Sequence, residues 1–133
     1  MSSLSARVEL PPVARSVPAA RRVLLELLQA WGAPHDAEDA ALLLTELVTN
    51  VIDHVGGANA LTVELTFSGA WLRIAVVDGS AIRPVVRELD RENPRGRGLR
   101  MVQEIADRWG ADEEGDGKRV WFDIAPVPSN DTA

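Results

Sequence analysis

The sequence predicts an α+β fold: a two-layer sandwich in which helices cover one face of a mostly antiparallel, mixed sheet. Two observations favour this class. Segments with helical periodicity are separate from segments with strand alternation, and the alternating segments come as hairpins. A length of 133 residues allows one domain, which we place at residues 6–126, between small polar tails at 1–5 and 127–133.

The N-terminal part of the chain predicts a strand followed by a helix. Residues 6–12 alternate between apolar and polar and end in a double proline, which is typical of a short edge strand. Ser16 as N-cap, with Pro18 in the first turn, predicts the start of a helix. Gly32 ends the apolar periodicity and is expected to terminate this helix.

The middle of the chain predicts a second helix and a hairpin. The helix covers residues 36–55 and is opened by Asp36 or His35. Residues 60–67 and 71–77 alternate as two half-buried strands around a Ser-Gly turn. These two strands are therefore expected to pair with each other.

The C-terminal part predicts a long loop, a helix and a second hairpin. Residues 79–98 have no clear period, although 85–89 can form one helical turn. A helix is expected over 98–109, because its apolar residues share one face. Strands at 110–114 and 118–125 then complete the domain.

Composition excludes several classes of protein. The absence of cysteine excludes disulfides, thiolate metal sites and a cysteine nucleophile. The sequence has no window of 18 apolar residues, so we expect no transmembrane helix. The first residues also lack an apolar signal core, so we expect a cytoplasmic protein. A net charge of −6 argues against direct binding to nucleic acid, which needs a basic face.

The second predicted helix carries a polar stripe. On a helical wheel Glu46, Asn50 and Asp53 fall within an arc of about 60°. A glutamate can accept a proton or hold a water, and an asparagine offers a neutral oxygen to a hard cation such as Mg²⁺. A plain amphipathic helix with a solvated polar face explains the same wheel, so both interpretations stay open.

A carboxylate stands at the end of a predicted strand. Asp78 leaves the apolar run and is followed by Gly79. Aspartate is common in turns, which is one explanation of this position. The other is that its carboxylate accepts a hydrogen bond from an amino group, such as that of adenine.

A glycine pair precedes the third predicted helix. Gly96 and Gly98 lead into its N-terminus, where backbone N–H groups and the helix dipole favour an anion such as phosphate. Arg95, Arg97 and Arg100 add positive charge. A flexible loop is the alternative. No third glycine and no Gly-Lys-Ser/Thr follows, which excludes a dinucleotide fingerprint and a P-loop.

Taken in order, the three motifs resemble the GHKL (Bergerat-fold) ATP-binding family. The motif sequences are most similar to those of its small branch of anti-sigma factor serine kinases, where Glu-Leu-Val-Thr-Asn is followed by a His. Here these residues are 46–50 and His54. The resemblance covers about residues 8–125. Three further stretches look like that branch: 16–21, 96–110 and 120–122.

The resemblance implies a site for ATP or ADP with Mg²⁺. It implies that Glu46 is the general base, that Asn50 ligates Mg²⁺ and that Asp78 accepts from the adenine amino group. Gly96 and Gly98 would cradle the phosphates. The remaining cofactor-binding residues that it implies are Asp53, His54, Gly79, Arg95, Arg97 and Leu99. Arg21, on the first predicted helix, lies where relatives contact a partner.

The function that the resemblance implies is an ATP-dependent protein serine/threonine kinase of the anti-sigma factor type. It would phosphorylate a STAS-domain antagonist (an anti-anti-sigma factor) on Ser or Thr and bind a sigma factor. It would contact neither nucleic acid nor membrane, and relatives often form homodimers. A sensor histidine kinase would carry a phosphoacceptor dimerisation helix, and a gyrase- or MutL-like ATPase would need a further domain; 133 residues leave no room for either.

Departures from the family pattern favour an alternative. Ser80 and Ile82 stand where the family has glycines, and 116–119 lack the Thr that often helps to hold adenine. A side chain at a glycine position can crowd the base or restrict the backbone. The alternative is therefore a protein-binding regulator on the same fold, with weak or no nucleotide binding and no kinase activity.

Overall fold

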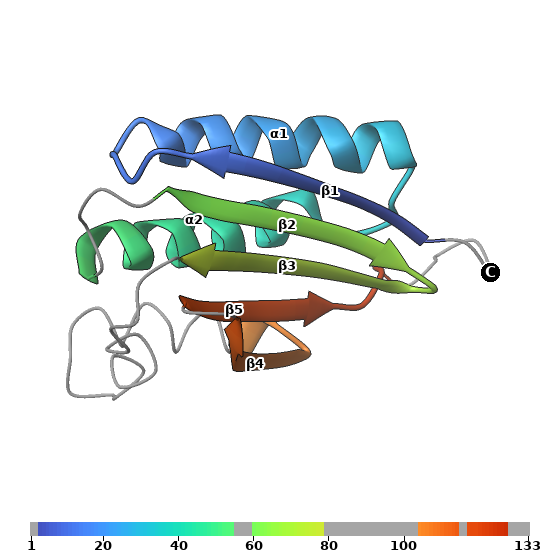
Figure 1. Ribbon diagram of the computed structural model, residues 1–133. Helices are drawn as coiled ribbons and strands as arrows, with labels where there is room; N and C mark the ends of the chain where they lie inside the picture. Colours follow the sequence, from blue (N-terminus) through green and yellow to red (C-terminus); the bar gives the residue numbers. More distant parts are fainter. Residues whose placement is uncertain (1–2, 55–59, 79–103, 115–116, 128–133) are drawn as a thin grey trace, which may run out of the picture.

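A computed structural model describes residues 3–54, 60–78, 104–114 and 117–127. Two helices cover one face of a five-stranded sheet with strand order β1-β2-β3-β5-β4 (Figure 1). All four strand pairs are antiparallel, so the predicted α+β class is confirmed and no parallel pair occurs among the described strands. The elements are β1 (Ser3–Leu10), α1 (Ser16–Trp31), α2 (Ala37–His54), β2 (Leu61–Ser68), β3 (Trp71–Asp78), β4 (Arg108–Glu114) and β5 (Gly117–Ile124).

Strand β1 forms the predicted edge but begins earlier than expected. It pairs with β2 without a break, from Ser3 opposite Ser68 to Leu10 opposite Leu61. Residues 3–5, predicted as part of a tail, therefore belong to the sheet. The backbone of an edge strand pairs whatever its side chains are, so small polar residues can extend it.

Helix α1 ends as predicted but begins differently. Ser16 is not the N-cap: Arg15 holds that position without a side-chain cap. Ser16 is the first helical residue, and its Oγ donates to the carbonyl of Pro11 at 2.6 Å. Gly32 ends the helix with a φ of 62°, the left-handed conformation that glycine adopts without strain, and its N–H donates to Gln29.

Helix α2 is capped by Asp36, one of the two residues predicted to open it. The Asp36 Oδ1 accepts from the backbone N–H of Asp39 at 3.0 Å, which satisfies a donor of the first turn. His35 is buried instead. Its Nε2 donates to the carbonyl of Ala70 at 2.9 Å, and its ring packs edge-on against Phe67.

The hairpin of β2 and β3 is confirmed, while the third predicted helix is wrong at its C-terminal end. Residues 79–103, with the predicted loop and the 85–89 turn, lie outside the described residues. Arg108 and Trp109, expected to be helical, already belong to β4 and pair with Asp123 and Phe122. The apolar residues before them have helical spacing, but Arg108 and Trp109 pair with β5 through their backbone groups.

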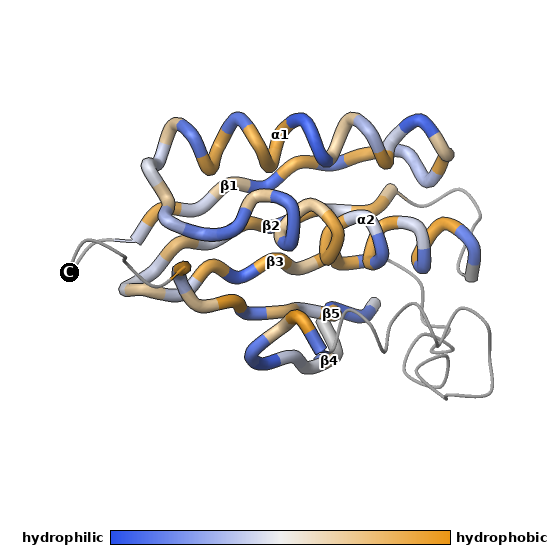
Figure 2. Tube along the Cα trace, turned by 180° about the vertical axis from the view of Figure 1, so that it is seen from behind, coloured by the Kyte–Doolittle hydropathy of each residue, from blue (hydrophilic) through white to orange (hydrophobic). Residues whose placement is uncertain are grey.

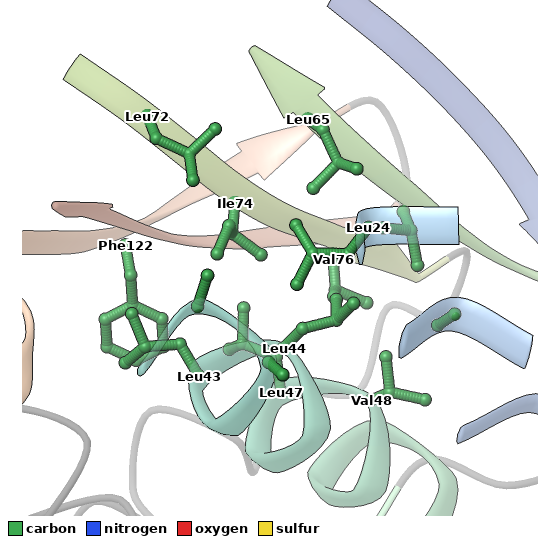
Figure 3. Packing of buried hydrophobic residues seen from close by; sticks show 14 of the residues in the cluster. Leu24, Leu43, Leu44, Leu47, Val48, Leu65, Leu72, Ile74, Val76 and Phe122 are labelled. Carbon is green, nitrogen blue, oxygen red and sulfur yellow. The ribbon is translucent and has the colours of Figure 1, made fainter. Parts of the chain in front are cut away.

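The core lies between the helix layer and the sheet. Figure 2 shows the hydrophobic stretches of α1 on the side toward the sheet and its hydrophilic stretches on the far side. In Figure 3 the apolar residues of α2 point toward those of the central strands. Fully buried members of this cluster include Leu24, Leu43, Leu44, Leu47, Val48, Leu65, Leu72, Ile74, Val76 and Phe122. None of the described helices is long and apolar enough to span a bilayer.

Candidate functional site

The polar stripe of α2 runs along the margin of the core. Asn50 is buried, with 5% of its surface exposed, Glu46 is half-buried and Asp53 is exposed. Leu43 and Leu47, which flank the stripe, are fully buried. Because Glu46 and Asn50 are one turn apart, they face the same region beside the sheet.

The end of β3 brings Asp78 to the same end of the molecule. Helix α2 stops at His54, and β2 begins at Leu61, whose register partner is Asp78. The C-terminal half of α2 and the C-terminal end of β3 therefore lie together (Figure 1). Two of the three predicted motifs, Glu46 with Asn50 and Asp78, meet at one end of the sheet.

The side-chain amide of Asn50 has one buried atom without a partner among the described residues. Its Nδ2 is buried and has no hydrogen-bond partner among the described residues. Buried polar atoms nearly always have a partner, so an orphaned amide beside a core indicates a place for a ligand. The oxygen and nitrogen of an amide exchange by a flip, so either can face the site. An amide oxygen is a ligand that Mg²⁺ accepts, so this residue fits the predicted role.

Glu46 is a half-buried carboxylate on the polar stripe of α2. Burial raises the pKa of its carboxyl above the ordinary value of 4.5. A carboxylate with a raised pKa is a stronger base than an ordinary one. Within the described part of the chain, no group of three or more His, Cys, Asp or Glu could hold a metal ion.

Asp78 has a charged neighbour that the sequence analysis missed. It lies directly opposite Lys118 in the β3–β5 ladder, and each residue is only 3% exposed. The sequence analysis had noted only that a Thr is lacking near this position. Lys118 is the single lysine of the sequence, but its relation to Asp78 depends on the strand register.

The glycine and arginine residues predicted to hold phosphate cannot be compared with the structure. Gly79, Arg95, Gly96, Arg97, Gly98 and Leu99 all lie outside the described residues, as do Ser80 and Ile82. His54 is the last residue of α2, which places its backbone at the same end of the molecule as Asp78.

Arg21 lies at a different place, on the exposed side of α1. It lines a hollow of about 450 Å³ between α1 and the N-terminal half of α2, with Leu25, Leu42 and Thr45. Leu25 is 41% exposed in this hollow. The residue predicted to contact a partner is thus accessible and adjoins an apolar surface.

The family is shown by comparison with known proteins. Residues 10–124 match the model of the histidine kinase-like ATPase domain, which is most of the chain. The chain therefore belongs to the histidine kinase-like ATPase family. It is also 33% identical over 91 residues to an uncharacterized protein of Streptomyces coelicolor, SCO4941, over 66% of this chain and 87% of that protein.

A solved structure has the same fold. It contains the RsbU and RsbW domains of Rv1364c from Mycobacterium tuberculosis and superposes with a TM-score of 0.66 at 17% sequence identity. The match covers 95% of this chain and 34% of that chain, so the present chain spans about a third of the length of its structural relative.

Proposed function

We propose that the chain is an ATP-binding regulator of the anti-sigma factor type, which phosphorylates a STAS-domain antagonist on Ser or Thr and binds a sigma factor. The observation that carries the nucleotide site is the buried Nδ2 of Asn50, which has no partner among the described residues. Asn50 is one turn from Glu46, at the end of α2 that lies near Asp78. These are the groups that the family resemblance requires for magnesium, proton transfer and adenine.

Each residue has a distinct role in this proposal. The Asp78 carboxylate accepts from the adenine amino group, and the Asn50 oxygen holds the cation. When bound, Mg²⁺ offsets the negative charge of the phosphates. Glu46 takes the proton of the acceptor Ser or Thr hydroxyl while that oxygen bonds to the γ-phosphorus. The bond from the γ-phosphorus to the bridging oxygen breaks, and ADP leaves.

The partners are proposed on two grounds. The motif sequences resemble those of the anti-sigma factor serine kinases. The solved structure with this fold has an RsbW domain by its description. Arg21 and the hollow between α1 and α2 provide an accessible surface that combines one cation, one carboxylate (Glu38) and mostly apolar side chains. We therefore place the contact with a protein partner on this side of the helix layer.

A second candidate is the protein-binding regulator without kinase activity. The observation that favours it is Lys118, a long charged side chain buried beside the residue proposed to bind adenine. A pocket already filled by such a side chain would bind nucleotide weakly. The first measurement must therefore be nucleotide binding itself.

The test is calorimetric titration with Mg-ATP and Mg-ADP of the wild type and the variants Asp78→Asn and Asn50→Ala. We expect saturable binding by the wild type, loss of binding by Asp78→Asn, and loss of the magnesium dependence by Asn50→Ala. Glu9→Gln, which removes an exposed carboxylate from β1, is the matched control and should bind as the wild type does.

The outcome separates the two candidates. Binding by the wild type justifies a phosphorylation assay on STAS-domain proteins, in which Glu46→Gln should lose phosphotransfer but keep ATP binding. No binding by the wild type at millimolar nucleotide contradicts the kinase proposal. It would favour the protein-binding regulator, to be tested by capture of a sigma factor.

A further inference from the structure

A buried lysine and a buried aspartate stand side by side at the end of the sheet. Asp78 is the last residue of β3, and Lys118 is the second residue of β5. They are direct register partners, so both side chains leave the same face of the sheet and lie within reach of each other. Each is 3% exposed, although lysine is almost never fully buried without a compensating charge.

The face on which the pair lies is the one that holds the nucleotide in the proposed function. Ile74 and Val76, two and four residues before Asp78 on β3, are buried in the core against the helices. Because side chains alternate along a strand, Asp78 and its partner Lys118 also point to the helix side. This is the side from which Asn50 of α2 approaches the end of the sheet.

The two side chains have complementary hydrogen-bonding capacity. A carboxylate only accepts, and an ammonium only donates. Next to one another, they match a ligand edge that has a donor beside an acceptor. The six-membered ring of adenine has such an edge: the N6 amino group donates, and the adjacent N1 accepts.

We propose that Lys118 is a specificity-determining residue, whose ammonium donates to N1 of adenine while Asp78 accepts from N6. This inference rests on the proposed function, because it requires a nucleotide at this site. A lysine at position 118 differs from the family pattern, in which a Thr in this stretch often helps to hold adenine. A lysine there brings a charged donor to the base. Guanine has an acceptor in place of the N6 amino group and should bind more weakly than adenine.

The test is a cycle in which one atom is changed on the ligand and one group on the protein. ATP is compared with 1-deaza-ATP, in which N1 is replaced by C–H, on the wild type and on Lys118→Met. The wild type should bind 1-deaza-ATP at least about tenfold more weakly than ATP, as expected for loss of a hydrogen bond to a charged group. Lys118→Met should bind both ligands with nearly equal affinity.

The controls separate base reading from a merely structural role. Arg119→Met removes a cation from the next position of β5, on the other face of the sheet, and should keep the wild-type preference for ATP over 1-deaza-ATP. The ligand comparison on the wild type needs no variant, so it stands even if Lys118→Met does not fold. GTP, titrated in parallel, should bind more weakly than ATP.

Three results would overturn the inference while the proposed function stands. They are equal affinity of the wild type for ATP and 1-deaza-ATP, tighter binding of GTP than of ATP, and tighter binding of ATP by Lys118→Thr than by the wild type. The last would show that Lys118 obstructs the base. Absence of binding of every nucleotide to the wild type is a different result, which contradicts the proposed function and the inference together.

Discussion

Single residues of the candidate site lower the stability of the free protein. The amide of Asn50 is buried next to a packed core, and its Nδ2 has no partner among the described residues. Leaving one buried polar group unsatisfied costs about 1–3 kcal/mol. Glu46, one turn away, is half-buried, and burial raises the pKa of its carboxyl. Both features weaken the free fold and suit a bound cation and an acceptor hydroxyl.

Replacing Asn50 by leucine should therefore stabilise the free protein while it removes the proposed cation ligand. Leucine has a similar shape and no polar atom to satisfy, so we expect the free energy of unfolding to increase by about 1 kcal/mol. Urea denaturation measures this change. The matched control is Leu47→Asn, which puts an amide into the fully buried core and should decrease the free energy of unfolding by at least about 2 kcal/mol. A loss of stability in Asn50→Leu would show that the amide is satisfied.

Stability should depend on pH through Glu46. Its pKa is higher in the folded protein than in the unfolded chain, so the folded state binds the proton more readily. The contribution of Glu46 is present below the ordinary pKa of 4.5 and is lost as the pH rises through the folded pKa. Compared with Glu46→Gln, the wild type should therefore lose stability as the pH rises from 4 to neutrality. Thermal denaturation over this range checks the sign, and a constant difference between the two proteins would contradict it.

At the scale of elements, the face of the sheet opposite α1 and α2 is covered by interacting side chains. Asp123 on β5 is 1% exposed because Arg73 and Arg108 cover it, at 2.7 and 2.9 Å. The Arg73 guanidinium stacks over Trp121 at 3.9 Å, and Arg108 stacks over Trp71 at 3.7 Å. The hydrogen bond that Arg73 donates to Asp123 raises the pKa of Arg73 above its ordinary value. This network joins β3, β4 and β5 on the face opposite the two described helices.

Removing the charge of Asp123 should loosen these three strands. In Asp123→Asn the two arginines lose a charge-assisted partner, and we expect the free energy of unfolding to decrease by about 1–3 kcal/mol. Asp112→Asn is the control on the same face, since Asp112 is exposed and should change stability by less than about 1 kcal/mol. Chemical denaturation of both variants tests the difference. Equal effects would mean that the network does not depend on burial of Asp123.

At the scale of the whole molecule, the two-layer sandwich brings together elements that are distant in the sequence. Helix α2, the end of β3 and the start of β5 meet at one end of the sheet (Figure 1). The residues that hold them there are apolar: Leu44 of α2 is fully buried against the cluster that includes Ile74 and Phe122. The geometry of the candidate site therefore depends on core packing several residues away from it.

Truncating the core should weaken the fold and the site together. Leu44→Ala leaves a cavity between the layers, and we expect the free energy of unfolding to decrease by about 2–5 kcal/mol. Leu4→Ala, at a 42% exposed position of β1, should change it by less than about 0.5 kcal/mol. Urea denaturation gives both values. Similar values for the two variants would contradict the described core.

A ligand that binds only the folded state should raise the stability of the entire molecule. At a nucleotide concentration one hundred times Kd, the expected gain is about 2.7 kcal/mol. Mg-ATP should therefore raise the Tm of the wild type and leave that of Asp78→Asn unchanged. A Tm of the wild type that does not respond to Mg-ATP would argue against the site.

Local chemistry made much of the fold and part of the site predictable. The left-handed Gly32, the Asp36 cap and the β2–β3 hairpin each depend on neighbouring residues, and each prediction is confirmed. The stripe of Glu46 and Asn50 follows from helical spacing alone. Their chemical roles were predicted from the family resemblance and stay proposals.

The errors in the prediction concern residues whose bonding partners are not their nearest neighbours in the chain. Helical periodicity extended the third helix over Arg108 and Trp109, but pairing with β5 places them in a strand. Ser16 has the residue type of an N-cap, yet its hydroxyl bonds to Pro11 in the preceding turn. Neither outcome can be read from nearest neighbours, because each depends on a partner chosen by the tertiary fold.

The sequence by itself determined most of the described helices and strands, which face of α2 is polar and which family the motifs resemble. These properties arise from spacing along the chain. Only the tertiary structure decided that the Asn50 Nδ2 is buried without a partner among the described residues, that Asp123 is buried under two arginines and that Lys118 lies opposite Asp78. Burial and strand register are set by contacts between residues far apart in the chain, so they become fixed only when the sheet and the helix layer pack together.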